Sequence, residues 1–160
     1  MTAAERQALI ARYGEGVRQF EEALATVPAE AMQWRPGPNK WSAHEVAVHC
    51  ADSETTSAVR IRFLVGESNP TLLGYDQDAW TRTFDYHAYP LEVARAQVQA
   101  VRRYTHEMIR RLPESAWSRE GTHTEVGRYT AEDWLRIYAE HLEVHARQIR
   151  RNVDAWRAAR

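Results

Sequence analysis

The sequence contains a single cysteine, Cys50, so no disulfide bond can form within the chain. It has no apolar run that approaches the roughly 18 residues of a transmembrane helix. Its first residues, Met-Thr-Ala-Ala-Glu-Arg, lack the apolar core of a secretory signal peptide. These absences predict a cytoplasmic protein that has no membrane partner.

The chain also lacks an excess of charge of either sign. Lysine and arginine number 21 and aspartate and glutamate 22, which gives a formal net charge of −1. Because proteins that bind nucleic acid usually carry a clear basic excess, we do not expect a nucleic-acid partner. Neither a glycine-rich phosphate loop nor a nucleophile elbow occurs, so two common kinds of catalytic site are not expected.

What the chain does contain is enough apolar residues for one globular domain. Hydrophobic residues make up 44% of its 160 residues, and we expect a single domain over residues 1–160. Four segments carry apolar residues at steps of three and four, which is typical of amphipathic helices: 3–26, 42–64, 91–112 and 130–156. Ser42 and Glu45 form a capping box, and Thr130 is a suitable N-cap.

The connection over residues 66–90 is much longer than most helix–helix loops. It holds a predicted short helix near 77–82. A connection of this length can span a bundle, which would leave the second and third long helices parallel. No segment shows convincing strand alternation, so the sequence predicts an all-α fold, a four-helix bundle with a long connection between helices 2 and 3.

Seven histidines stand out, and two of them, His141 and His145, lie four residues apart in the last predicted helix. At about 100° per residue, both side chains lie on one face, where two imidazoles can bind the same metal ion. His49 lies on the inward face of the second predicted helix. Three neutral imidazoles that share one divalent ion avoid the cost of burying a protonated histidine, whereas the simpler interpretation is three hydrogen-bonded core histidines.

Other polar residues near this predicted site have more than one interpretation. Gln148 either contacts the histidine pair or packs between helices, and Asp52 either orients an imidazole or is a surface acid. His123 either caps an open site or is solvated or structural, and we favour the second interpretation. His44 lies about 140° around the helix from His49, away from the site. Cys50 is expected to be a small buried hydrophobic residue.

The sequence resembles the DinB-like family of metalloenzymes, also called DinB/YfiT-like. The resemblance rests on Trp34-Arg-Pro-Gly-Pro-Asn-Lys-Trp41-Ser-Ala-His-Glu-Val-Ala-Val-His49, on Gly74-Tyr-Asp-Gln-Asp-Ala-Trp80, on Gly121-Thr-His-Thr-Glu-Val-Gly127 and on His141-Leu-Glu-Val-His145. It covers essentially the whole chain. It implies an up-down-down-up bundle and a metal triad of His49, His141 and His145. Because related bundles often pair, we also expect a homodimer.

The resemblance also implies chemistry. Three histidines leave a divalent ion an open position, which is typical of catalytic sites. We expect zinc or nickel, with iron or manganese as alternatives. Relatives are transferases or isomerases that use a low-molecular-weight thiol, and others are regarded as hydrolases, so we expect an S-transferase or a hydrolase with a small-molecule substrate. The alternative is a non-catalytic metal-binding stress-response protein. An open position beside Tyr75, Trp80 or Tyr138 favours the enzyme, and a fourth protein ligand or a sealed site favours the alternative.

Overall fold

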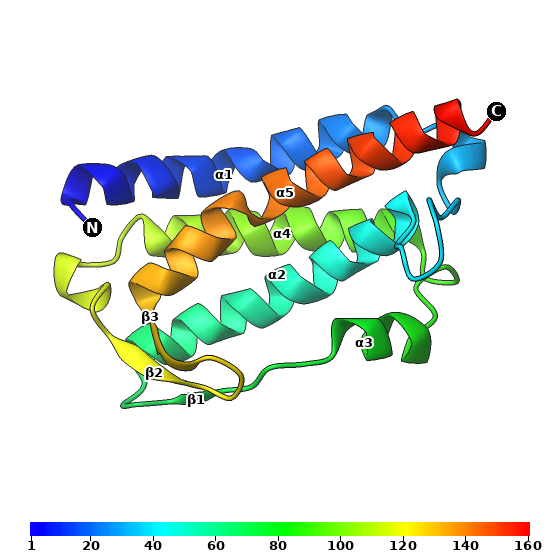
Figure 1. The fold of residues 1–160 in the computed structure, drawn as a ribbon. Helices are drawn as coiled ribbons and strands as arrows, with labels where there is room; N and C mark the ends of the chain where they lie inside the picture. The colour runs from blue at the N-terminus through cyan, green and yellow to red at the C-terminus, as the bar shows by residue number, and fades with distance from the viewer.

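The computed structural model describes residues 1–160, and helices account for most of the chain (Figure 1). The α-helices are α1 (Ala3–Ala25), α2 (Ala43–Gly66), α3 (Gln77–Thr83), α4 (Leu91–Ile109) and α5 (Ala131–Ala158). Short 3-10 helices occur at Ala29–Ala31 and Glu114–Ala116. The predicted helix bounds agree closely with the observed ones, and the largest difference is that α4 ends at Ile109 rather than Leu112.

Local hydrogen bonds explain where the helices begin. The Ser42 hydroxyl accepts from the Glu45 backbone N–H at 3.1 Å, and the Glu45 carboxylate accepts from the Ser42 N–H at 2.9 Å, which confirms the predicted capping box. Thr130 and Asp133 form a second box at the start of α5. Since each box fixes the first residue of a helix, it also fixes which side chains face inward further along.

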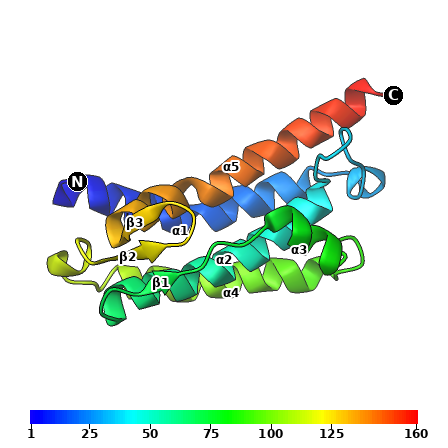
Figure 2. The same ribbon diagram turned by 60° about the horizontal axis from the view of Figure 1, so that its bottom comes forward.

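The four long helices pack side by side as a bundle. α1 lies mainly against α5, and α2 lies against both α4 and α5 (Figures 1 and 2). The connection between α2 and α4 runs along the outside of α2 from one end of the bundle to the other, and α3 lies near its far end (Figure 1). As a result, α2 and α4 both begin at the end of the bundle where the C-terminus lies (Figure 1).

The predicted helical bundle is present, but the expectation of a purely α-helical fold missed a small three-stranded sheet. Strand β2 (Glu120–His123) pairs antiparallel with β3 (Gly127–Thr130) and parallel with β1 (Thr71–Leu72). Gly127 closes the hairpin at φ +76°, a left-handed conformation that favours glycine. These strands are too short to show a repeating pattern, and the β1–β2 pair joins residues about 50 positions apart in the chain, as Thr71 with Thr122 shows.

The core consists of two hydrophobic clusters. One surrounds Phe20, Val46, Val98 and Ile149. The other, near the sheet, surrounds Tyr13, Ile61, Ile109, Trp117 and Trp134, which is fully buried. No helix in the structure is both long and apolar enough to cross a membrane.

A layer of buried polar residues crosses the bundle between the two clusters. On α2 it consists of Ser53, Glu54 and Ser57, and on α4 of Arg102 and Thr105. All five are at most 4% exposed. Burying polar groups in a core costs free energy unless they are partnered. This layer therefore serves a purpose other than hydrophobic packing.

Candidate metal centre

The structure brings His49, His141 and His145 together where α2 packs against α5. One ring nitrogen from each lies within 4.8 Å of the others. The ring centroids are 4.6 Å apart for His141 and His145, 4.8 Å for His49 and His145, and 5.8 Å for His49 and His141. The two histidines of α5 and His49 on the inward face of α2 therefore come together, as the sequence predicted.

Hydrogen bonds fix the orientation of the two histidines on α5. His145 Nδ1 donates to Gln148 Oε1 at 2.9 Å, and His141 Nδ1 donates to Glu54 Oε1 at 2.8 Å. An amide oxygen and a carboxylate can only accept, so each Nδ1 carries a proton and Nε2 is the ring nitrogen that is not held by these partners. Ligation through Nε2 with Nδ1 held by an acceptor is a common arrangement around metal ions in proteins.

His49 is the most deeply buried of the three, with 2% of its surface exposed. Its ring lies 4.7 Å from the Trp41 ring, between centroids, and its Nδ1 has no hydrogen-bond partner. Burial, followed by the neighbouring His145 and His141, holds the pKa of His49 well below its usual range. Burial likewise lowers the pKa of His145 to about 4, so both rings are neutral at neutral pH.

These residues fit a divalent ion. A tetrahedral zinc ion with Zn–N bonds of about 2.1 Å holds its ligand nitrogens about 3.4 Å apart, so nitrogens within 4.8 Å need to move only slightly. The lowered pKa values of His49 and His145 leave these two rings neutral and able to act as ligands. His49 Nδ1 is buried and has no hydrogen-bond partner in the protein, which is expected of an imidazole whose partner is a bound group rather than a protein group.

Sequence reasoning missed the carboxylate that orients His141. Glu54 is fully buried, and Arg102 Nη1 donates to its Oε1 at 2.7 Å. Burial opposes ionisation of Glu54, but Arg102 and the hydrogen bond from His141 outweigh it and hold the pKa of Glu54 below its usual range. A signal was present: Glu54 lies one turn beyond Cys50 and Arg102 one turn beyond Val98, so both charges occupy buried helical positions.

Several candidates from the sequence lie outside the cluster. His44 Nε2 contacts the Tyr89 carbonyl oxygen at 2.8 Å, and His123 Nδ1 accepts from the Glu125 N–H at 3.2 Å, so both are structural. Cys50 is free and fully buried, as predicted.

Two other candidates now have defined partners. The Asp52 carboxylate accepts a hydrogen bond from the Tyr86 hydroxyl rather than from an imidazole, so it orients no histidine of the triad. Gln148 contacts His145, which decides between the two roles that the sequence allowed for it. Of the aromatic candidates, Tyr138 lies against the site, with its ring centroid 5.3 Å from that of His141.

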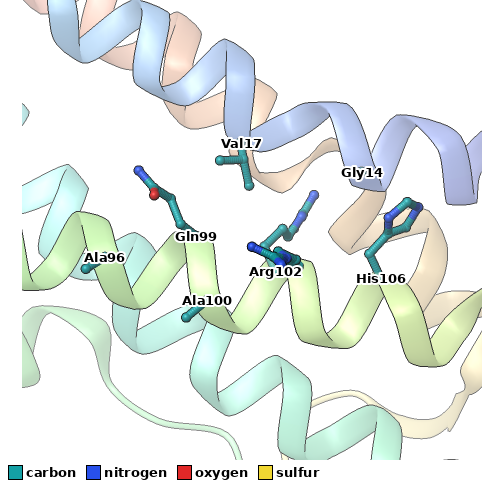
Figure 3. A pocket seen from close by; sticks show the side chains of 8 residues that line it. Gly14, Val17, Ala96, Gln99, Ala100, Arg102 and His106 are labelled. Atoms are coloured by element: carbon teal, nitrogen blue, oxygen red, sulfur yellow. The ribbon is translucent and has the colours of Figure 1, made fainter.

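A groove of about 510 Å³ lies between α1 and α4 (Figure 3). In this view Gln99 and His106 extend from α4 toward α1, which contributes Gly14 and Val17. No histidine of the triad lines it. The groove is therefore distinct from the candidate metal centre.

The depressed pKa of His145 predicts a pH dependence for the metal-free protein. Between about pH 6.5, the usual pKa of an unfolded histidine, and about pH 4, the unfolded chain binds a proton that the folded chain does not. The free energy of unfolding therefore decreases as the pH is lowered through this window, by about 1.4 kcal/mol per pH unit for this residue. Urea unfolding at several pH values should show a shallower slope for His145→Gln than for the wild type; equal slopes would contradict the assignment.

The sequence and the fold match those of known proteins. The sequence profile of the DinB superfamily matches residues 13–149, and the chain belongs to this superfamily. This confirms the family resemblance read from the sequence.

The individual relatives share less than 30% of their residues with this chain over the matched regions. A protein of Oceanobacillus iheyensis named "Putative metal-dependent hydrolase OB0782" is 28% identical over 109 residues, which is 68% of this chain and 63% of the relative. A protein of Bacillus subtilis named "Putative metal-dependent hydrolase YfiT" is 26% identical over 110 residues, which is 68% of this chain and 62% of the relative. The matches thus span less than two thirds of the length of these relatives.

Solved structures show the same fold. The structure of Bacillus subtilis YfiT, described as "a probable metal-dependent hydrolase with an unusual four-helix bundle topology", superposes with a TM-score of 0.88 at 20% identity, over 95% of this chain and 87% of that one. The DinB-like protein YjoA of Bacillus subtilis superposes with a TM-score of 0.61 at 14% identity, over 92% of this chain and 90% of that one.

Proposed function

We propose that this protein is a metal-dependent enzyme that acts on a small molecule at a centre formed by His49, His141 and His145. The observation that carries the proposal is the convergence of three histidine nitrogens with no carboxylate or thiol in the group. The His141 side chain is 13% exposed, so the site is not sealed. Three protein ligands and an accessible position are typical of catalytic rather than structural sites.

A divalent ion in such a site acts as a Lewis acid that activates a water or thiol and polarises the substrate. The protein residues prepare the site for it. Glu54 and Gln148 hold the rings of His141 and His145 in one tautomer, so that both present Nε2. Burial keeps His49 and His145 unprotonated, so protons do not compete for these nitrogens near neutral pH.

The reaction we propose first is hydrolysis, which the names of the relatives support. Transfer of a low-molecular-weight thiol is the second candidate. Its support is chemical: three neutral ligands leave the ion its full double charge, which stabilises a thiolate as well as it activates water. Zinc or nickel suits imidazole ligands best, and we propose one of these as the native ion.

The experiment compares the purified protein before chelation, after chelation, and after reloading with zinc, nickel, manganese or iron(II). p-Nitrophenyl acetate reports hydrolysis, and glutathione with 1-chloro-2,4-dinitrobenzene reports thiol transfer. We expect an activity that chelation abolishes and one of the ions restores. Activity in the glutathione assay but not with p-nitrophenyl acetate would favour the S-transferase. No response in either assay from the fully loaded protein would favour the non-catalytic metal-binding protein.

A further inference from the structure

Polar side chains continue from the triad along the contact between α2 and α5, toward the sheet. On α2, Ser53 and Arg60 follow His49 by four and eleven residues, so the three lie on one helical face. On α5, Tyr138 lies one turn before His141. Tyr75 comes from the connection between α2 and α4. These four residues, Ser53, Arg60, Tyr75 and Tyr138, are called here the polar extension of the site.

Contacts place the polar extension next to the metal-facing side of the triad. The Ser53 hydroxyl oxygen lies 3.3 Å from His141 Nε2, the ring nitrogen that Glu54 does not hold. The Tyr138 ring packs on the His141 ring. Burial raises the pKa of Tyr138, and Arg60 and Ser53 beside its hydroxyl oppose that shift. Arg60 and Ser53 thus both lie beside the phenol that contacts His141.

Two donors in the polar extension are buried without a protein partner. Arg60 pairs with no carboxylate; its Nη2 donates to the Leu73 carbonyl oxygen, and its Nε has no acceptor. The Tyr75 hydroxyl is also buried and unpartnered. The Arg60 guanidinium carbon lies 5.8 Å from the Tyr75 ring centroid, so the two groups are neighbours. Buried polar groups are nearly always hydrogen-bonded, and two unpartnered donors on neighbouring side chains point to a ligand that accepts.

We propose that Arg60 and Tyr75 bind a carboxylate of the substrate, and that the enzyme therefore acts on small anionic molecules. The proposal rests on the proposed function, since it places the substrate at the three-histidine centre. A guanidinium N–H and a phenol O–H match the two acceptor oxygens of a carboxylate, and a cation without an ion pair favours a charged over a neutral acceptor. A carboxylate held there leaves the rest of a small substrate near Ser53 and His141.

The test uses the zinc-loaded protein and trifluoroacetate as the carboxylate probe, with binding followed by fluorine NMR. Trifluoroacetamide is the neutral probe of nearly the same shape. Arg60→Gln removes the charge, and Tyr75→Phe removes one hydroxyl. The matched controls are Arg62→Gln, on the same helix but stacked on the Tyr104 ring at 4.8 Å, and Tyr104→Phe, at a residue that is 71% exposed.

We expect trifluoroacetate to bind about tenfold more weakly to Arg60→Gln and several-fold more weakly to Tyr75→Phe, with both controls within about twofold of the wild type. Trifluoroacetamide should bind all variants alike. Equal trifluoroacetate affinity of Arg60→Gln and Arg62→Gln would overturn the proposal. So would an equal loss for both probes, because that would mean that Arg60 only anchors the connection through Leu73.

Zinc content separates this proposal from the one on which it rests. If the wild type takes up no zinc, the proposed function fails. If every variant takes up one zinc and the trifluoroacetate affinities are alike, only the carboxylate site fails. Should Arg60→Gln not fold, Arg60→Lys keeps the charge and Tyr75→Phe keeps the ring. In that case a wild-type trifluoroacetate affinity in Tyr75→Phe would overturn the proposal, because the phenol hydroxyl would then bind no carboxylate.

Discussion

Replacing His145 with alanine is expected to reduce the affinity for zinc or nickel by at least about a hundredfold, while the wild type binds one ion per chain. The variant removes one of three nitrogens that lie within 4.8 Å of one another. Even the loss of a residue that only orients a ligand typically costs 10- to 100-fold in affinity, so the loss of a ligand should cost at least as much. Elemental analysis after dialysis and a competition titration with a chelator measure the effect.

The control is His106→Ala, a histidine of the groove between α1 and α4 that is not part of the cluster. It should bind metal like the wild type. Circular dichroism should show that His145→Ala remains helical, because the buried apolar residues of the four helices do not depend on an ion. Full metal content in His145→Ala, or none in the metal-replete wild type, would contradict the triad.

Replacing Arg102 with methionine is expected to destabilise the metal-free protein by about 3–5 kcal/mol. Arg102 is 1% exposed, and its guanidinium donates to Glu54 at 2.7 Å, to the Tyr138 carbonyl at 2.8 Å and to the Tyr13 carbonyl at 2.9 Å. Methionine fills much of the volume but leaves a buried carboxylate without its counter-charge and two carbonyls without a donor. A loss of this size is a large part of the stability of a typical domain.

Urea unfolding measures this loss, and the adjacent Arg103→Met is the control. Arg103 is exposed, so its replacement should change the free energy of unfolding by no more than about 0.5 kcal/mol. Adding Glu54→Gln to Arg102→Met removes the uncompensated charge and should recover part of the loss. A change of less than about 1 kcal/mol in Arg102→Met would show that the buried pair does not stabilise the fold.

The Arg102 variant also tests the link between the core and the metal centre. Arg102 holds Glu54, and Glu54 holds the proton of His141 Nδ1. The same variant should therefore weaken metal binding by about 10- to 100-fold, as expected when the partner of a ligand is disturbed. The buried polar layer is thus the support of the candidate site as well as the boundary between the two hydrophobic clusters.

The helices and part of the site could be predicted from the sequence because they depend on short-range interactions. The box of Ser42 and Glu45 closes over three residues, and His141 and His145 share a face because they are one turn apart on one helix. His49 was placed on an inward face by the same helical period. The homodimer, the cytoplasmic location and the identity of the metal stay predictions, since none depends on a local pattern.

Tertiary structure alone decided which residues complete the site. Glu54 and Arg102 can be recognised in the sequence as charges at buried positions, but their pairing joins α2 to α4 across 48 residues, and only packing brings them to His141. The same is true of the sheet, where β1 and β2 meet from distant parts of the chain, and of Arg60 and Tyr75, whose unpartnered donors have no local signature. Helical periodicity determines the direction in which a side chain points, whereas the packing of the helices determines what it meets there.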